Sequence, residues 1–344
     1  MMGTADFKRL GWWALWNTCA GVCPLVWAVD TLAQAPSPGA GQASGQAFPN
    51  KPIRVIVGFP PGGGPDVTAR SVGRKMSDNV GQPVVIENRP GSSGYIALER
   101  LTNAAADGYT LLMMSSNDAA LPSLRSKLAV DITRDLSPVS LVTAGPMMLV
   151  VRPTLAAKNV KELVALAQSQ PGKLQYGTSG AGGTVHLTSE LFNSMAKADI
   201  RHVPFKGSAD SILAVASGEI DMSFPSVTAA QPLVEAGRLR GLAVTGAKRM
   251  PSVPSLPTLD ESGLKGFDRT AWYGVSAPAG VPKPIVARLN EEISKAANTA
   301  DMKAFFLKQG LEVQTNTPEQ FAAFIRSEVA QASKLAKLAG IKPE

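Results

Sequence analysis

The sequence contains very little cysteine and histidine, with two residues of each among 344. Cys19 and Cys23 lie in an N-terminal apolar segment that we expect to be removed, so the mature chain has no thiol. This excludes a disulfide, thiol catalysis and a zinc–thiolate site. His186 and His202 have no acidic or cysteine partner at metal-ligand spacing, so we interpret both as structural. Because a Gly-x-Ser-x-Gly elbow is also missing, we expect no enzyme, catalytic residue, metal or cofactor.

The sequence also lacks the two common nucleotide-binding signatures. Phe59–Arg70 (FPPGGGPDVTAR) places three glycines between an apolar run and a helical pattern. Pro65-Asp66 follows Gly64, so the Gly-Lys-Ser/Thr of a P-loop is absent, and so is the Gly-x-Gly-x-x-Gly of a dinucleotide site. Glycines still allow close approach to a ligand, and free N–H groups at a helix start favour an anion. A turn that binds nothing is the alternative interpretation.

The N-terminus has the layout of a secretory signal peptide. Lys8-Arg9 precedes an apolar segment over residues 10–29, and Ala33–Ala35 offers a small-residue cleavage site. We expect residues 1–35 to be a signal peptide that is cleaved near Ala35, so that the mature protein is exported. An uncleaved membrane anchor is the alternative, since the apolar segment is near the lower length limit for spanning a bilayer.

Composition favours an ordinary globular protein beyond this segment. Residues 36–47 are rich in Pro, Gly, Ser and Gln and are predicted to be a flexible linker. The net charge is +7, but the basic residues after the linker are scattered, without a run of four and without alternating aromatics. We therefore expect no nucleic-acid partner.

Strand and helix patterns alternate along the rest of the chain. Short apolar runs predict strands at Ile53–Phe59, Val84–Glu87, Tyr109–Met114, Pro146–Val151, Ile200–Val203, Met222–Phe224, Leu239–Val244 and Trp272–Ala277. Helical patterns lie between them and in the tail, where Thr317 and Gln320 form a capping pair. This order predicts an α/β fold with a mostly parallel sheet and helices on both faces. Ligand-binding loops of such sheets lie at the carboxyl ends of strands, where Gly62–Gly64, Gly91–Gly94 and Ser115–Asp118 fall.

Several blocks of the sequence resemble the Bug family, the periplasmic solute-binding proteins of tripartite tricarboxylate transporters. The matching blocks run in order through nearly all of the mature chain: FPNKPIRVIVG (48–58), PPGGGPDVTAR (60–70), GQPVVIENRPGSSG (81–94), DGYTLL (107–112), HVPFKG (202–207), LAVTGAKR (242–249), PAGV (278–281) and PEQFAAF (318–324). The resemblance implies a type II periplasmic-binding-protein fold, in which two α/β lobes enclose a ligand cleft. We expect lobe 1 over residues 48–148 and 272–344 and lobe 2 over residues 149–271. Pro146–Val151 and Trp272–Ala277 are the candidate crossing strands.

The resemblance also implies a small carboxylic acid as ligand, held largely by backbone amides and bound waters. The family's first cleft loop corresponds to Phe59–Asp66 and its facing loop to Ser179–Thr184. The candidate ligand-binding residues are Phe59, Pro61, Gly62, Gly63, Gly64, Asp66, Ser115, Ser116, Asn117, Ser179, Gly180, Thr184, Phe205, Lys206 and Phe224.

Some of these assignments have alternatives. Asp66 either orients a water or an ammonium group or forms an ion pair with Arg70 four residues on. Lys206 either meets an anion or is simply solvated. Asp118, if it faces the cleft, favours a ligand that carries an amine. A valine at Gly63 is expected to intrude on the ligand or to forbid the required backbone dihedrals.

The sequence thus predicts a non-catalytic, monomeric solute-binding protein. We expect it to capture a small carboxylate and deliver it to the membrane subunits of a tripartite tricarboxylate-type transporter. A periplasmic sensor that presents the carboxylate to a signalling receptor is the alternative.

Overall fold

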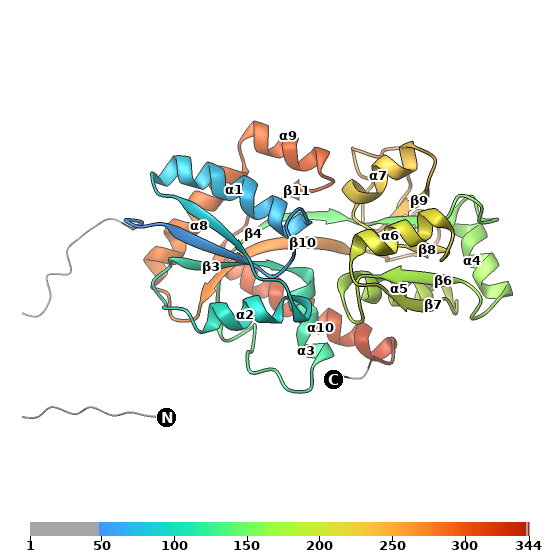
Figure 1. The fold of residues 1–344 in the computed structure, drawn as a ribbon, viewed down its shortest axis with the longest axis horizontal. Coiled ribbons are helices and arrows are strands. Elements are labelled where there is room, and N and C mark those ends of the chain that lie inside the picture. The colour runs from blue at the N-terminus through green and yellow to red at the C-terminus, as the bar shows by residue number, and fades with distance from the viewer. Residues whose placement is uncertain (1–47, 342, 344) are drawn as a thin grey trace, which may run out of the picture. The chain divides into compact units, whose positions relative to one another are not determined.

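The computed structural model describes residues 48–341 and residue 343. The predicted signal peptide and linker lie outside the described residues. The described chain forms two sheets, each covered by helices (Figure 1). We use lobe 1 for the six-stranded sheet with its helices and lobe 2 for the five-stranded sheet with its helices.

The sheet of lobe 1 has the strand order β11-β4-β10-β3-β1-β2. Its strands are β1 (Ile53–Val57), β2 (Val84–Asn88), β3 (Thr110–Ser115), β4 (Leu136–Pro146), β10 (Thr270–Pro278) and β11 (Glu312–Val313). Strand β1 pairs in parallel with β2 and β3, whereas β10 is antiparallel to both β3 and β4. The apolar, β-branched composition of β1 suits a strand that is covered on both faces.

Helices cover both faces of this sheet. They are α1 (Gly64–Val80), η1 (Ser92–Gly94), α2 (Tyr95–Thr102), α3 (Ser116–Leu124), α8 (Lys283–Ala297), α9 (Ala300–Lys308) and α10 (Pro318–Leu338). One core joins the sheet to α1 and α8 through residues such as Val72 and Leu289. A second core, on the other face, joins it to α2 and α10 through Leu98 and Phe321. Gly81, with φ +65°, ends α1 in the left-handed conformation that favours glycine.

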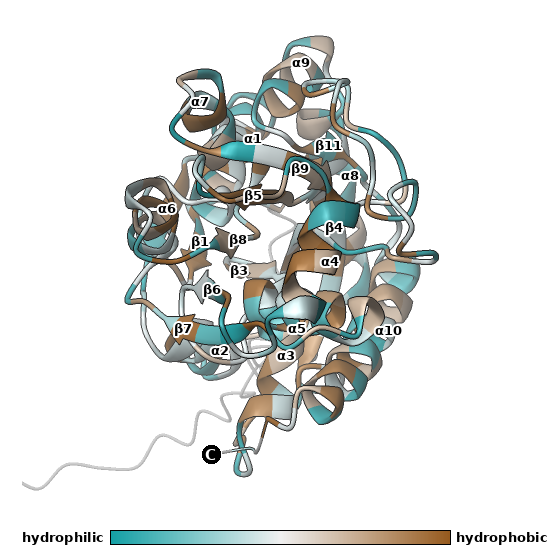
Figure 2. Ribbon diagram, turned by 90° about the vertical axis from the view of Figure 1, so that its right-hand side faces the viewer, coloured by the Kyte–Doolittle hydropathy of each residue, from teal (hydrophilic) through white to brown (hydrophobic). Residues whose placement is uncertain are grey.

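Lobe 2 has the strand order β7-β6-β8-β5-β9. Its strands are β5 (Met148–Val151), β6 (Gln175–Thr178), β7 (Arg201–Pro204), β8 (Met222–Ser223) and β9 (Arg240–Val244), and its helices are α4 (Val160–Ser169), α5 (Thr184–Ala196), α6 (Ser208–Ser217) and α7 (Val227–Glu235). Strand β5, which pairs with β8 and β9 inside the sheet, is brown in Figure 2 because its residues are apolar. Helices α4 and α5 share one core and α6 and α7 share the other.

The chain passes between the lobes twice, and one threonine ties the two passages together. It leaves β4 at Pro146 and enters β5 at Met148, and it returns between β9 and β10. The N–H of Met147 donates to Thr245 Oγ1 (2.9 Å), and this hydroxyl donates to the carbonyl of Arg269 (2.5 Å). The expected crossing over Trp272–Ala277 therefore needs correction, since these residues pair within the sheet of lobe 1.

Helix α10 adds a third connection between the lobes. Ala120 of α3, Leu187 of α5 and Leu335 of α10 meet in one small apolar cluster. The predicted fold class is confirmed, because the structure has two α/β lobes. The expectation of a mostly parallel sheet is wrong: β1 pairs in parallel with β2 and β3, but β10 and β11 in lobe 1 and β5 in lobe 2 pair antiparallel with their neighbours.

Candidate functional site

The glycine loop of lobe 1 leads directly into α1. Gly63 is the N-cap of this helix and provides no side chain to bond the first turn. Pro65 has no N–H, and the N–H of Val67 donates to the carbonyl of Gly63 (2.9 Å). Gly62, with φ +85°, is the residue that requires left-handed backbone, whereas Gly63 is extended with φ −75° and ψ 166°. The expectation that dihedral angles forbid a side chain at Gly63 is therefore wrong.

Asp66 braces this loop from within. Its side chain is buried and accepts hydrogen bonds from the N–H of Gly62 (2.9 Å), Arg70 Nε (3.0 Å) and Asn88 Nδ2 (2.8 Å). Burial alone would raise the pKa of the Asp66 carboxyl, but the bonds from Arg70, Gly62 and Asn88 outweigh it and lower the pKa. Of the two interpretations of Asp66, the ion pair with Arg70 is present, and the carboxylate is used inside the protein.

Gly64, the first residue of α1, lies against a tyrosine from β10. A Cβ atom built on Gly64 would lie 2.2 Å from Tyr273 Oη. Only glycine lets the tyrosine hydroxyl come this close to the start of the helix. Tyr273 is not among the residues predicted from the sequence, because this contact joins segments that are far apart in the chain.

The facing loop of lobe 2 is also rich in glycine and also opens a helix. Gly180 and Gly182 have φ values of +125° and +75°, and Gly183 is the N-cap of α5 without a side-chain bond of its own. Thr178 shapes the loop, since its hydroxyl donates to the carbonyl of Gly180 (2.9 Å) and accepts from the N–H of Gly180 (3.1 Å).

The two histidines are stacked on each other beneath this loop. Their ring centroids lie 3.9 Å apart, and the ring of Tyr176 stacks on His202 at 5.2 Å. The N–H of Gly182 donates to His186 Nδ1 (2.7 Å), so this nitrogen carries no proton. Because the one proton of the Thr178 hydroxyl goes to Gly180, His202 Nε2 donates to that hydroxyl (2.7 Å).

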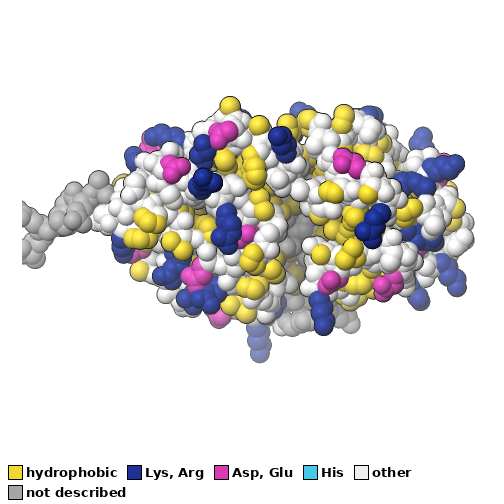
Figure 3. Space-filling view, turned by 45° about the horizontal axis from the view of Figure 1, so that its top comes forward, with side chains coloured by type: hydrophobic (Ala, Val, Ile, Leu, Met, Phe, Trp, Pro, Cys, Tyr) yellow, Lys and Arg dark blue, Asp and Glu magenta, His cyan; other side chains and the backbone are white. Residues whose placement is uncertain are grey.

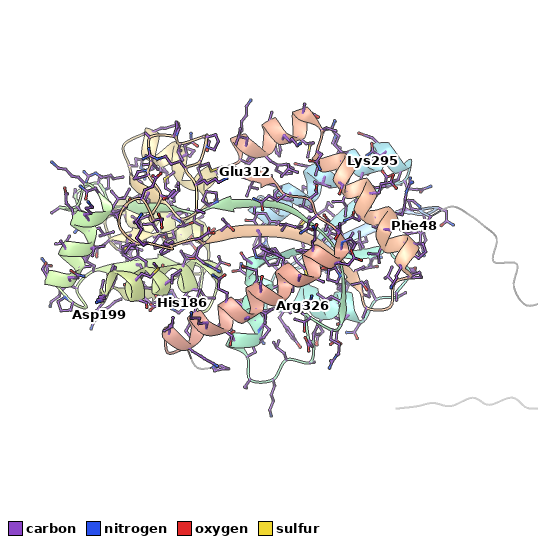
Figure 4. The ribbon with its side chains drawn as sticks, turned by 180° about the vertical axis from the view of Figure 1, so that it is seen from behind. Phe48, His186, Asp199, Lys295, Glu312 and Arg326 are labelled. Atoms are coloured by element: carbon purple, nitrogen blue, oxygen red, sulfur yellow. The ribbon has the colours of Figure 1, made fainter. Side chains whose placement is uncertain are left out.

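The bond from Gly182 holds His186 in the neutral form, and burial favours the neutral form of both histidines. Burial lowers the pKa of His186 to about 4, helped by the neighbouring His202, and burial also lowers the pKa of His202. Figure 4 labels His186 on α5, beside the end of α10. The structural interpretation of these residues agrees with the contacts, since each ring bonds to the glycine loop or to the threonine that shapes it.

Ser115–Asp118 begins a helix, although the sequence suggested a loop. Ser115 is the N-cap of α3, and Asp118 Oδ2 accepts from the N–H (2.6 Å) and the hydroxyl (3.0 Å) of Ser115. Asp118 is 2% exposed, and burial raises its pKa to about 6 against the opposing effect of the bonds from Ser115. The hypothesis that Asp118 faces the cleft and selects an amine is therefore wrong, because its carboxyl is buried in this capping box.

The start of α3 contacts the start of α5 across the two lobes. Asn117 Oδ1 accepts from the N–H of Thr184 (2.8 Å) and from its hydroxyl (2.9 Å). The Thr184 hydroxyl also lies 2.9 Å from Ser116 Oγ. A Cβ on Gly182 would lie 2.0 Å from Leu124 at the end of α3. The candidate residues Ser116, Asn117 and Thr184 are therefore brought together.

A path of contacts links the two glycine loops. Gly64 lies against Tyr273, and Tyr273 pairs with Ser115 in the sheet. Ser115 is followed by Ser116 and Asn117, which bond to Thr184 at the start of α5. The two helix starts therefore border one region between the lobes.

The remaining candidates differ in how much surface they offer. Phe59 is half-buried, whereas Pro61 and Ser179 are exposed. Phe205 is half-buried and packs against the core near α6, and Lys206 after it is exposed. Phe224 is fully buried against Phe192, with ring centroids 5.8 Å apart, so its side chain has no surface for a ligand.

Charge is dispersed over the described surface. Figure 3 shows Lys and Arg side chains interspersed with Asp and Glu on the face it draws, with no single basic patch. Within residues 48–341, no three His, Cys, Asp or Glu side chains gather as a metal site would require. No helix in this part of the chain has the length and apolarity that crossing a bilayer demands.

Comparison with known proteins agrees with this geometry. The family model described as tripartite tricarboxylate transporter family receptor matches residues 68–341. The chain belongs to this receptor family. Protein BugT of Bordetella pertussis is 34% identical over 305 residues, which cover 88% of this chain and 94% of BugT.

Two solved structures that are similar to this chain hold a small acid. One is R. palustris Rpa4515 with adipate, 34% identical with a TM-score of 0.80, which covers 87% of this chain and 100% of that one. The other is MatC from Rhodopseudomonas palustris with bound malate, 32% identical with a TM-score of 0.75, which covers 84% of this chain and 99% of that one. The periplasmic binding protein BugD is also similar, 30% identical with a TM-score of 0.77, and covers 86% of this chain and 100% of that one. The two-lobe architecture of this receptor is therefore that of periplasmic binding proteins.

Proposed function

We propose that this receptor captures a small carboxylate between its lobes and delivers it to the membrane subunits of a tripartite tricarboxylate-type transporter. The observation that carries the proposal is the pair of glycine loops that open α1 and α5 on opposite lobes. Each helix has a glycine N-cap without a side-chain bond. Apart from the N–H of Thr184, which bonds to Asn117 Oδ1, N–H groups of the first turns are therefore available to an anion without any side-chain charge. Adipate in Rpa4515 and malate in MatC support a carboxylate as the ligand.

The ligand contacts follow from the same geometry. We assign them to the loop Phe59–Gly64 on lobe 1, to Ser116, Asn117, Ser179, Gly180 and Thr184 near the start of α5, and to Phe205 and Lys206. Residues 1–35 are assigned to a signal peptide and the mature protein to the periplasm, as a non-catalytic monomer. Intact mass of the exported protein checks this, because it should begin near Pro36.

A panel of acids tests the ligand class. Adipate, malate and related mono- and dicarboxylates should raise the melting temperature. At a hundredfold excess over the dissociation constant, binding stabilises the folded state by about 2.7 kcal/mol. The matching amides and methyl esters should not, since they lack the charge. Mass spectrometry of small molecules released from protein purified without refolding identifies the natural ligand. Equal shifts by acid and amide would contradict an anion site.

Gly63 gives a sharper test of the loop. A Cβ on Gly63 has its nearest neighbours at 3.7 Å and 3.8 Å, and its backbone is extended, so a valine fits the protein itself. Gly63→Val should therefore fold normally and lose affinity by roughly ten- to hundredfold, the loss of one hydrogen bond to a charged group. A folded variant with wild-type affinity in calorimetry would leave this loop as a structural turn.

A further inference from the structure

Tyr273 is placed where the sheet of lobe 1 meets the start of α1. In β10 it pairs with Ser115 at the carboxyl end of β3 and with Thr143 in β4. Thr143 Oγ1 in turn lies 3.4 Å from Thr68 Oγ1 of α1. The ring packs against the core under α1, and the hydroxyl points to the first residue of that helix.

The approach of this hydroxyl to α1 depends on a glycine. A Cβ on Gly64 would lie 2.2 Å from Oη of Tyr273 and 2.5 Å from its Cζ, distances that real Cβ atoms do not show. The hydroxyl thus lies beside the N–H groups at the start of the helix, which have no i−4 carbonyl to bond. A donor at this position adds to the anion-binding capacity of the helix start.

The hydroxyl of Tyr273 has no hydrogen-bond partner within the described part of the chain. Two other tyrosine hydroxyls do have partners, because Tyr109 donates to Asn50 (2.8 Å) and Tyr176 donates to Glu190. The Tyr273 side chain is only partly buried. A polar group that is held close to a helix start without a partner in the protein is available to a bound molecule.

We propose that the Tyr273 hydroxyl donates a hydrogen bond to the ligand carboxylate at the start of α1, which makes Tyr273 a specificity-determining residue. The proposal rests on the proposed carboxylate-binding function and adds a side-chain donor to its backbone donors. Burial raises the pKa of Tyr273 to about 12, so the phenol keeps its proton at neutral pH and can donate it.

Tyr273→Phe removes the hydroxyl and leaves the ring. Calorimetry with adipate, malate and the acid panel should show affinity lower by roughly ten- to hundredfold, the effect of one hydrogen bond to a charged group. Tyr109→Phe is the matched control, since its hydroxyl bonds to Asn50 and lies away from the glycine loops. It should bind the acids as the wild type does. Without ligand, Tyr273→Phe should melt near the wild-type temperature, whereas Tyr109→Phe should melt somewhat lower, because its hydroxyl bonds to Asn50.

An ultraviolet difference spectrum gives a second measurement that a merely structural tyrosine would not change. Addition of the bound acid should shift the tyrosine absorption of the wild type and of Tyr109→Phe, and the shift should be lost in Tyr273→Phe. Wild-type affinity in Tyr273→Phe, or an unchanged difference spectrum, would overturn the assignment while the receptor function stands. A wild-type protein that binds no acid of the panel would overturn the proposed function and this inference with it.

Discussion

The glycine loop before α1 is braced by charged groups, whereas the loop before α5 is braced by neutral ones. In lobe 1, the Asp66 carboxylate bonds to Gly62 and pairs with Arg70. In lobe 2, the N–H of Gly182 bonds to a neutral imidazole of His186, which is stacked on His202. The two loops serve one proposed function but respond differently to acid, because their braces carry different charges.

The different response to acid follows from the protonation state that each loop needs: a charged Asp66 in lobe 1 and a neutral His186 in lobe 2. A lowered pKa for Asp66 means that its bonds persist until the solution is more acidic than the usual carboxylate range. A lowered pKa for the histidines means that folding holds them neutral while the unfolded chain takes up protons below about pH 6.5. Mild acid should therefore weaken the loop of lobe 2 before it weakens the loop of lobe 1.

The largest expected effect on the loop of lobe 2 comes from Gly182→Ala. An alanine there would hold φ +75° and place its Cβ 2.0 Å from Leu124. Left-handed strain and crowding against Leu124 together should lower the free energy of unfolding by about 2–3 kcal/mol. Gly183→Ala is the control, with φ −65° and 3.4 Å to Asn117 Oδ1, and should be near neutral. Urea unfolding measures both, and equal costs would contradict the assigned roles.

The second prediction concerns how stability depends on pH in the variant His186→Asn. The asparagine keeps an oxygen that can accept from the N–H of Gly182, but it has no group that takes up a proton in this pH range. The neutral His186 of the folded state contributes stability that is fully present above pH 6.5 and is lost as the pH falls toward about 4. Between pH 7 and pH 5 the wild type should lose on the order of 2 kcal/mol relative to the variant.

Urea unfolding of both proteins at each pH gives this difference. Asp118, whose raised pKa acts in the opposite direction, is present in both proteins and cancels. Parallel pH profiles for the wild type and the variant would rule out the histidine stack as the acid-sensitive brace.

The third prediction tests the contact between the lobes. Thr184→Val keeps the shape but loses the hydroxyl that bonds to Asn117 and Ser116, and should cost about 1 kcal/mol of stability. Thr184→Ser keeps the hydroxyl and should cost less. Thermal melts compare the two variants, and a serine variant as unstable as the valine variant would show that the methyl group matters more than the hydroxyl.

The smallest effect is expected from Lys206→Ala. The side chain is exposed, and the proposed anion donors are mainly backbone groups at helix starts. Acid affinity in calorimetry should change by less than about fivefold, the range of an exposed charge pair. A hundredfold loss would instead give Lys206 the main role in holding the anion.

Local patterns predicted the elements around the first glycine loop well. The apolar run of β1, the glycine at the end of α1 and the capping pair of α10 all act over a few residues, and the structure confirms them. Strand β4 was not predicted, because Pro138 and Gly145 interrupt an otherwise apolar pattern. Helix α3 also escaped, because its first residues are polar and Pro122 lies inside it.

The sequence could not show which glycine of the loop needs its freedom. Gly62 needs it for φ +85° and Gly64 for the contact with Tyr273, while Gly63 does not. These demands come from backbone geometry and from a strand far away in the chain. The same limit applies to Thr184, whose partners Ser116 and Asn117 lie on the other lobe. Contacts between distant segments therefore decide most of the candidate site.

The position of β10 determines when the sheet of lobe 1 can form during synthesis of the chain. It lies in the middle of the sheet of lobe 1, between β3 and β4, yet it comes after the whole of lobe 2 in the sequence. Until Thr270–Pro278 has been synthesised, β2-β1-β3 and β4 share no neighbour, and both expose unpaired edges. Lobe 2, in contrast, is built from strands that follow one another between β5 and β9. A growing chain can thus assemble lobe 2 while lobe 1 stays open, so lobe 1 is completed only after the whole of lobe 2 has been made.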